Sequence, residues 1–122
     1  MRRSVATFLL VVLAFLGCAT FEAGQLYSSG TEALDRGDSA RAVADLERAA
    51  ELVPHASEIQ NHLGLAYAAE GRDGEALLAF RRAVALDCGN LAARRNLQAA
   101  EVRARETRLE VNPPGSVPSA AD

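Results

Sequence analysis

Lysine and tryptophan are absent from this sequence of 122 residues, and all 13 of its basic residues are arginines. Only 5% of the residues are aromatic although 49% are hydrophobic, because alanine supplies much of the apolar total. Small apolar residues suit closely packed helices better than a β-sandwich or a β-barrel. The formal net charge of −3 gives no electrostatic basis for binding nucleic acid, which depends on neutralising phosphates. The length leaves room for one domain.

Groups that carry catalysis or hold metals are also scarce. The two histidines, His55 and His62, lie seven residues apart without a neighbouring cysteine or paired carboxylates, which is too few ligands for a zinc site. The turn at residues 71–74 is rich in glycine but lacks the strand and the Lys-Ser/Thr pair of a phosphate-binding loop. We therefore expect a protein that is not an enzyme and has no metal and no cofactor.

The N-terminal segment, residues 1–17, has the pattern of an export signal. Arg2 and Arg3 precede a charge-free stretch from Val5 to Leu16. A helix that spans a bilayer needs about 20 apolar residues, so this stretch is short for a permanent span and suits a cleaved signal. A buried N-terminal helix fits less well, because the stretch is apolar on every face.

The segment Phe15-Leu16-Gly17-Cys18 ends this stretch and resembles the lipobox of bacterial lipoproteins. In those proteins a small residue precedes a cysteine that is diacylated before the signal is removed, and Gly17 and Cys18 match that pattern. Phe15 and Leu16 are looser matches, and ordinary signal-peptidase cleavage after Ala19 stays open. The resemblance implies that Cys18 is lipidated, and two or more acyl chains hold a protein stably on a membrane.

The second cysteine, Cys88, has two interpretations. Two cysteines in an exported chain usually indicate a disulfide, but an acylated Cys18 would leave Cys88 alone. We expect Cys88 to be a small, half-buried packing residue. The alternative is a free thiol that bridges two molecules.

The sequence contains an internal repeat. When residues 23–56 are placed over residues 57–90, six positions are identical, and most hold glycine, alanine or leucine, which are exacting in helix packing. A repeat of this length predicts an array of stacked helical units. The identical pairs are Gly30 and Gly64, Gly37 and Gly71, Ala42 and Ala76, Arg48 and Arg82, Ala49 and Ala83, and Leu52 and Leu86.

The second copy contains the most informative motif, which is Leu63-Gly64-x-x-Tyr67, then Ala76-x-x-x-Phe80, then Ala83. This motif resembles the tetratricopeptide repeat (TPR), whose period matches the offset between the two copies. Gln60 and Cys88 depart from that family, which often has tryptophan and proline at these places.

The first copy is more degenerate, because Ser29 and Ala33 stand where the family has leucine and tyrosine. It nevertheless has small, large and proline residues at the matching places. Those residues are Gly30, Ala42, Leu46, Ala49 and Pro54.

The resemblance implies an all-α fold, a short TPR α-solenoid of two helix-turn-helix repeats and a C-terminal capping helix. We expect helices over about 22–36, 39–52, 57–70, 73–86 and 91–109. The parts of the chain would be a lipoprotein-type signal peptide (1–17), a short tether (18–22), repeat 1 (23–56), repeat 2 (57–90), the capping helix (91–109) and a disordered tail (110–122).

Turn and cap residues support these boundaries independently of the resemblance. Gly37 and Gly71 suit left-handed helix C-caps. Asp38 or Ser39, Asp73 and Asn90 offer N-caps, and Ser57-Glu58-Ile59-Gln60 reads as a capping box. In the last helix, an apolar stripe can cover the preceding repeat, while the remaining surface bears arginine and glutamate. That stripe consists of Ala93, Leu97, Ala100 and Ala104.

Two repeats and a cap make a short array, since about three repeats are usually needed for stability. Either the last helix is sufficient, or a partner, a second copy or the membrane surface covers the N-terminal end.

In the TPR family, the first helix of each repeat lines a groove that receives a peptide or a partner helix. The family's clamp for a C-terminal carboxylate is not expected here, because Ser28 and His62 stand at its asparagine sites and the chain has no lysine. Position by position, the resemblance nominates Tyr27, Thr31 and Leu34 in repeat 1, Glu58, Asn61, His62, Leu65 and Ala69 in repeat 2, and Arg95 in the last helix.

The sequence thus favours a membrane-anchored TPR lipoprotein that acts as a scaffold or adaptor for another protein or peptide of the bacterial cell envelope, for example in secretion or pilus assembly. Ala19-Thr20 follow Cys18 without an aspartate, which in lipoproteins points to the outer membrane, facing the periplasm. The alternative is an exported, soluble homo-oligomeric module without a lipid, whose array ends pair. Neither hypothesis involves nucleic acid.

Overall fold

The computed structural model describes the backbone of residues 2–111 and the side chains of Phe8, Val12 and residues 19–111. Within that range the chain is helical throughout, apart from short turns, which confirms the expected all-α class. The expected ranges of the last four helices agree with the structure to within two residues. The helices are α1 (Arg2–Asp35), α2 (Ser39–Leu52), α3 (Ser57–Ala69), α4 (Asp73–Leu86) and α5 (Leu91–Val111).

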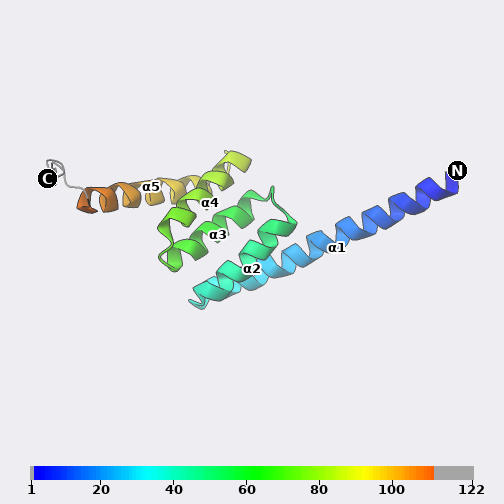
Figure 1. Cartoon of the computed structure of the whole chain (residues 1–122), viewed down its shortest axis with the longest axis horizontal. Coiled ribbons are helices and arrows are strands. Elements are labelled where there is room, and N and C mark those ends of the chain that lie inside the picture. Colours follow the sequence, from blue (N-terminus) through cyan, green and yellow to red (C-terminus); the bar gives the residue numbers. More distant parts are fainter. Residues whose placement is uncertain (1, 112–122) are drawn as a thin grey trace, which may run out of the picture.

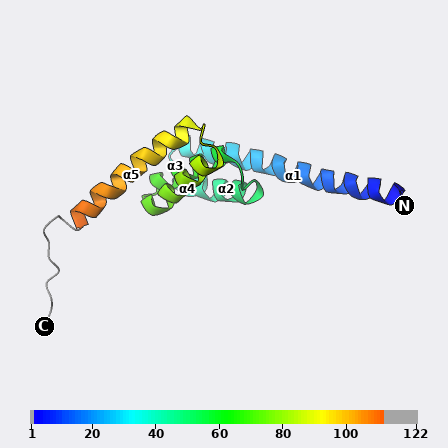
Figure 2. The same ribbon diagram turned by 90° about the horizontal axis from the view of Figure 1, so that it is seen from above.

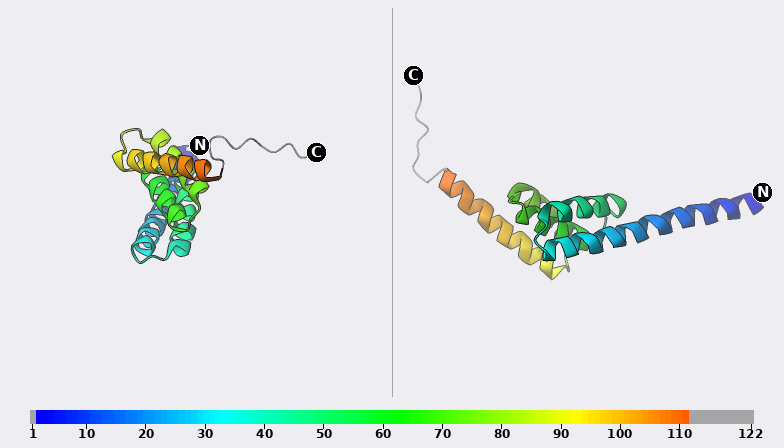
Figure 3. Two further views of the ribbon diagram at one scale, coloured as in Figure 1. Left: turned by 90° about the vertical axis from the view of Figure 1, so that its left-hand side faces the viewer. Right: turned by 90° about the horizontal axis from the view of Figure 1, so that it is seen from below.

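The helices form two hairpins and a final helix. α1 packs against α2 and α3 against α4, while α2 also contacts α3 and α4 also contacts α5 (Figure 1). Figure 2 shows α1, α3 and the beginning of α5 on one side of the molecule and α2 and α4 on the other, with α5 running obliquely away from the other helices, and the right-hand view of Figure 3 agrees. We call the side formed by α1, α3 and α5 the inner face, and the side formed by α2 and α4 the outer face.

Helix α1 begins much earlier than expected. The sequence predicted a helix from about residue 22 after a tether over residues 18–22, but one helix runs unbroken from Arg2 to Asp35. Residues 2–35 contain no proline and many leucines and alanines, so nothing local stops the helix. The first part of α1 projects away from the other helices (Figure 1), and Ala23 is the first buried residue described.

Some predictions fall on residues that the structure does not describe. The Cys18 side chain and residues 112–122 of the expected tail are among them, so the lipidation site and the disordered tail stay predictions. Within the described part of the chain, no helix is both long enough and apolar enough to cross a membrane.

One glycine turn connects the two helices of each hairpin. Gly37 and Gly71 have positive φ angles of 76° and 75°, which only glycine adopts without strain. In the first turn, the Gly37 N–H donates to the Leu34 carbonyl and the Asp38 N–H donates to the Ala33 carbonyl, both over 2.9 Å. The second turn repeats this pattern after α3. The predicted C-caps are confirmed.

The predicted N-caps are confirmed in part. Asp38 accepts a hydrogen bond from the Arg41 N–H over 3.2 Å, and Asn90 accepts one from the Ala93 N–H over 3.0 Å. Asp73 is instead the first residue of α4, whose N-cap is Arg72. The predicted capping box at Ser57 is also wrong, because its hydroxyl donates to the Ala83 carbonyl of α4 over 2.9 Å.

Buried residues gather in two clusters. The first lies between α1, α2 and α3, and the second between α4 and α5, with the half-buried Tyr67 packed against both. A Cβ atom on Gly64 would lie 2.5 Å from Cε1 of Phe80, and one on Gly30 would lie 2.7 Å from Cγ of Leu46. Helix approach this close requires glycine at both places. Of the residues that carry the TPR motif, the structure buries Gly30, Ala42, Leu46, Ala49, Leu63, Gly64, Ala76, Phe80 and Ala83, and leaves Pro54 exposed.

The unpaired side of α1 is polar from Gln25 to Glu32, whereas Phe21, one turn earlier on the same side, is a 70% exposed aromatic residue. Ile59, Leu63 and Ala66 of α3 are all buried, but the residues one repeat earlier are Gln25, Ser29 and Glu32, which are exposed or half-buried. The Ser29 hydroxyl donates to Asp45 Oδ2 over 2.7 Å, and Glu32 pairs with Arg36 over 3.2 Å. The first repeat therefore presents polar groups at the end of the array, where the second repeat buries an apolar stripe.

Candidate protein-binding surface

Three residues predicted to line the groove meet on the inner face, between α1 and α3. The Tyr27 hydroxyl of α1 lies 3.2 Å from Nδ1 of His62, and their rings meet edge to face with centroids 5.2 Å apart. The same His62 nitrogen lies 3.0 Å from the Glu58 carbonyl oxygen. Tyr27 donates when Nδ1 carries no proton, whereas a protonated Nδ1 donates to Glu58. Burial, followed by the negative charge of Glu58, raises the pKa of Tyr27.

A second set of polar contacts joins α3 to α5. Asn61 is only 2% exposed, and its side-chain oxygen accepts a hydrogen bond from Asn96 Nδ2 over 2.9 Å. Asn90 Nδ2 donates to the Ser57 hydroxyl over 3.0 Å and to Glu58 Oε2 over 3.3 Å. The inner face therefore carries polar side chains from α1, α3 and α5 that hydrogen-bond to one another.

The other predicted groove residues are more dispersed. Leu34 packs against the first core cluster and Leu65 against the second, so both contribute to the core as well as to the surface. The Thr31 hydroxyl is used locally, since it donates to the Ser28 carbonyl over 3.0 Å. Ala69 and Arg95 are exposed. The structure thus brings together Tyr27, Glu58 and His62, and places Asn61 beside them on α3.

The order and glycine turns of these helices, and the lengths of α2 to α5, are those that the sequence motif implied. The family model of the tetratricopeptide repeat matches residues 27–92, which is more than half of the chain. This chain is a member of the tetratricopeptide repeat family. No curated protein matches it. TPR repeats mediate protein–protein interaction, so the chain is a protein-interaction module of that family.

Sequence reasoning did not identify Asn96 as part of this TPR surface. Asn96 lies 35 residues after Asn61, close to one repeat period, and that spacing was the available signal. Asn90 was expected only as a helix cap, yet its amide nitrogen also reaches Ser57 and Glu58. Among the described residues, no group of three histidine, cysteine, aspartate or glutamate side chains is placed to hold a metal ion.

Cys88 differs from its expected environment. Its thiol is free and exposed in the turn between α4 and α5, not half-buried. That turn is closed by Asp87, whose Oδ1 accepts a hydrogen bond from the Gly89 N–H over 2.8 Å, so no helix covers the cysteine.

A second polar cluster lies around Tyr67, on the opposite side of α3. The Tyr67 hydroxyl donates to Glu47 Oε1 over 2.6 Å, and the Arg72 guanidinium lies over its ring, 4.5 Å from the centroid. Arg72 also pairs with Glu75, which lowers the pKa of the Glu75 carboxyl. Burial, the hydrogen bond to Glu47 and the charge of Glu47 together raise the pKa of Tyr67 to about 12.

We expect Tyr67 to titrate with a pKa of about 12, above the value of about 10 for an ordinary tyrosine. Because the folded state holds this proton more tightly than the unfolded chain, the stabilisation is complete below pH 10 and disappears as the pH rises through 12. The Glu47→Gln substitution removes the charge and should bring the pKa back toward its ordinary value. Phenolate absorbance of the Tyr27→Phe variant, in which Tyr67 is the only tyrosine, measures this directly.

The matched control for this titration is Glu51→Gln, which removes a carboxylate of α2 that pairs with Arg48 over 2.9 Å and does not contact Tyr67. This control should leave the titration unchanged. An unchanged pKa in Glu47→Gln would show that the Tyr67–Glu47 hydrogen bond does not govern this group.

Proposed function

We propose that this chain is a membrane-anchored TPR lipoprotein of the bacterial cell envelope, which holds a segment of another envelope protein against its inner face without catalysing a reaction. The observation that carries the proposal is the inner face itself. Tyr27, Glu58, His62 and Asn96, from three helices, lie on this face, and hydrogen bonds among them and to the buried Asn61 hold them in place. Side chains held in place by one another lose little entropy when a peptide binds.

The lipid anchor is supported by the order of features at the N-terminus, over residues 1–18. Two arginines, an uncharged apolar stretch and a glycine precede Cys18. The backbone from Cys18 to Ala23 is helical, and five residues of helix rise only about 7.5 Å. A lipid on Cys18 would therefore hold the TPR body close to the membrane, so the partner would be bound near the lipid headgroups. Localisation to the outer membrane, facing the periplasm, and a role in secretion or pilus assembly belong to this proposal.

Fractionation of cells that process lipoproteins tests the anchor. We expect the full chain in the membrane fraction, and Cys18→Ser in the soluble fraction or retained as unprocessed precursor. The control Cys88→Ser changes the exposed thiol of the α4–α5 turn and should stay with the membrane. A processed Cys18→Ser protein that remains fully membrane-bound would contradict the lipid anchor.

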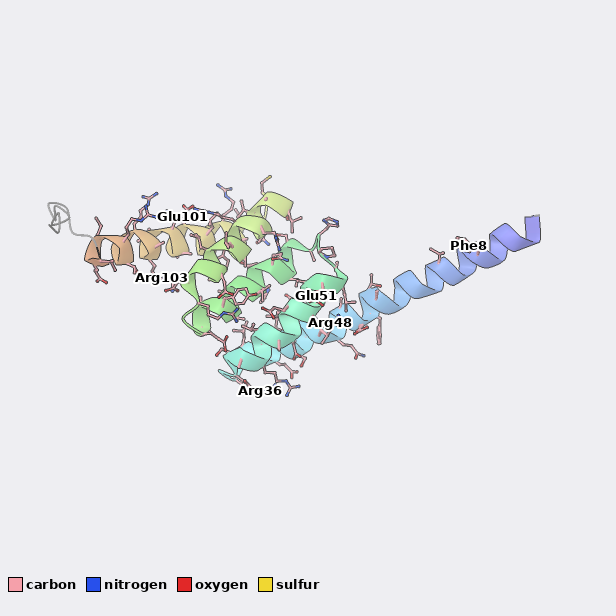
Figure 4. The ribbon with its side chains drawn as sticks, in the orientation of Figure 1. Phe8, Arg36, Arg48, Glu51, Glu101 and Arg103 are labelled. Carbon is pink, nitrogen blue, oxygen red and sulfur yellow. The ribbon has the colours of Figure 1, made fainter. Side chains whose placement is uncertain are left out.

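Crosslinking in intact cells tests the inner face. The Glu58→Ala/His62→Ala variant removes two of its exposed or half-exposed polar groups and should lose the crosslinked partner. The control Glu32→Ala/Arg36→Ala removes an exposed ion pair at the end of α1 (Arg36 is labelled in Figure 4), away from the inner face, and should keep the partner. Equal crosslinking by both variants would contradict binding at the inner face.

A further inference from the structure

A cleft opens on the outer face of the molecule, on the side of α3 opposite to the inner face. It consists of two adjoining hollows of about 410 and 350 Å³, within the size range of small-ligand sites. The floor is α3, one wall is the end of α2, and the other wall is α4. The two hollows share Gln60, Leu63, Tyr67 and Arg82.

Gln60 on the floor of this cleft is buried but has no partner. Gln60 is only 3% exposed, and its side chain forms no hydrogen bond with any residue of the range 2–111. No fully buried side-chain nitrogen or oxygen is left unsatisfied in the described part of the chain, so the Gln60 carboxamide must reach the cleft opening. An amide held in this way offers a donor and an acceptor at the opening of the cleft to whatever enters it.

The cleft lies where the family often places its own large aromatic side chain. Gln60 occupies the position at which TPR repeats often have tryptophan, and Leu26 occupies it in the first repeat. A glutamine is smaller than an indole, and the side chains around it are small or flexible: Ala50, Ala79 and Leu78. The hollow therefore has the walls of an aromatic site and lacks the ring.

Most of the charged groups at the rim already have a partner, but only two of them are in ion pairs. Glu47 accepts from Tyr67, Glu51 pairs with Arg48, and Glu75 pairs with Arg72. Arg82 is exposed and forms no ion pair with any described residue. The lining charges without an ion-pair partner are Glu47 and Arg82, which have opposite signs; Glu70, which shares Arg72 with Glu75, is not part of the lining. The cleft is therefore suited to a neutral occupant.

We propose that this outer cleft binds a tryptophan side chain of a partner protein, whose indole N–H donates to the Gln60 carboxamide oxygen. The indole ring lies between Leu63, Leu78 and Ala79 and contacts the ring of Tyr67. A phenylalanine would fill the same space but would cover the Gln60 amide without bonding it, which is unfavourable for a buried polar group. The site is separate from the inner face, because Gln60, Leu63 and Tyr67 project from the opposite side of α3 to Glu58, Asn61 and His62.

Binding of N-acetyl-tryptophanamide to the full chain in detergent micelles tests this proposal. Nuclear magnetic resonance can follow the backbone amides of Leu63, Leu78 and Ala79, which line the cleft in every variant, with empty micelles as the blank for the probe. We expect a dissociation constant on the order of 1 mM, since a single side chain has few atoms to bind with. N-acetyl-phenylalaninamide should bind about tenfold more weakly, the usual effect of one buried hydrogen bond.

Two substitutions at Gln60 locate the site. Gln60→Trp fills the cleft from within and should abolish binding of the probe without lowering the melting temperature. Gln60→Leu keeps the hollow but removes the amide, so the two probes should then bind equally. The inner-face variant Glu58→Ala/His62→Ala should bind the probe like the unmodified chain, which separates this test from that of the proposed function.

Three results would overturn the inference. The first is no binding up to about 10 mM probe. The second is equal binding of the two probes to the unmodified chain, because the amide would then not be recognised. The third is unchanged binding to a folded Gln60→Trp variant, because the probe would then occupy another place.

Discussion

Replacing Gly64 with alanine is expected to lower the free energy of unfolding by about 1–3 kcal/mol. The new Cβ would lie 2.5, 2.6 and 2.9 Å from three atoms of the Phe80 ring. Phe80 is 1% exposed and its ring is rigid, so it cannot turn aside without disturbing α4. Chemical denaturation followed by circular dichroism measures the change. A loss of this size is a large part of the stability of a small domain.

The matched control is Gly74→Ala, also within a helix. A Cβ on Gly74 would meet nothing within 4 Å, so the substitution should raise stability by about 0.5–1 kcal/mol through helix propensity. The double variant Gly64→Ala/Phe80→Leu identifies the cause of the loss. If the Phe80 ring is responsible, the two changes will be less harmful together than the sum of the single effects. Strict additivity would contradict the proposed clash.

Much of the fold could be predicted because its boundaries depend on local chemistry. Gly37 and Gly71 are required by the left-handed turns after α1 and α3, and the helices that follow begin where their positions indicate. The start of α1 could not be predicted in this way, since no proline or capping residue marks it. Ser57 shows the opposite difficulty. Its hydroxyl fits a local cap, but it bonds to Ala83, which only the packing of α3 on α4 brings near.

Sequence could predict those parts of the candidate site that are contacts between equivalent helices of the two repeats. Tyr27 and His62 come together because corresponding helices of successive repeats lie side by side. The Asn61–Asn96 hydrogen bond depends on the register of α3 against α5, which the more degenerate sequence of α5 does not reveal. The outer cleft was visible only as a missing tryptophan at Gln60. Its depth depends on how far apart α2 and α4 stand, which no local pattern encodes.

The polar end of α1 also answers the question that the short array raised. Repeat arrays need terminal units with polar outer surfaces, and Gln25, Ser29 and Glu32 provide such a surface in place of an apolar stripe. The replacement of leucine by serine at position 29, which looked like degeneracy of the motif, is consistent with this role. The surface therefore does not favour pairing of two array ends, as the homo-oligomer hypothesis requires.

Restoring the apolar stripe is expected to make the array ends associate. The variant Gln25→Ile/Ser29→Leu/Glu32→Ala gives the first repeat the same residue types that the second repeat has at the matching positions. Those residues of the second repeat, Ile59, Leu63 and Ala66, are buried. The new stripe would be exposed on α1, and hiding it from water in a dimer is favourable by about 25 cal/mol per Å². We expect dimers at micromolar concentration, measured by sedimentation in density-matched detergent, whereas the unmodified chain should remain monomeric.

A scattered variant separates the effect of the stripe from that of added hydrophobicity. Arg48→Leu/Glu70→Ala/Arg103→Ile introduces the same three residue types on α2, at the end of α3 and on α5, where they are not adjacent. It should remain monomeric, because separate apolar side chains on a surface do not form an interface. If the unmodified chain is a dimer and the Ser29→Arg substitution dissociates it, the polar end of α1 already pairs, and this result would favour the homo-oligomer. Monomers in all three proteins would mean that the end of α1 is closed to association by its shape and not by its polarity.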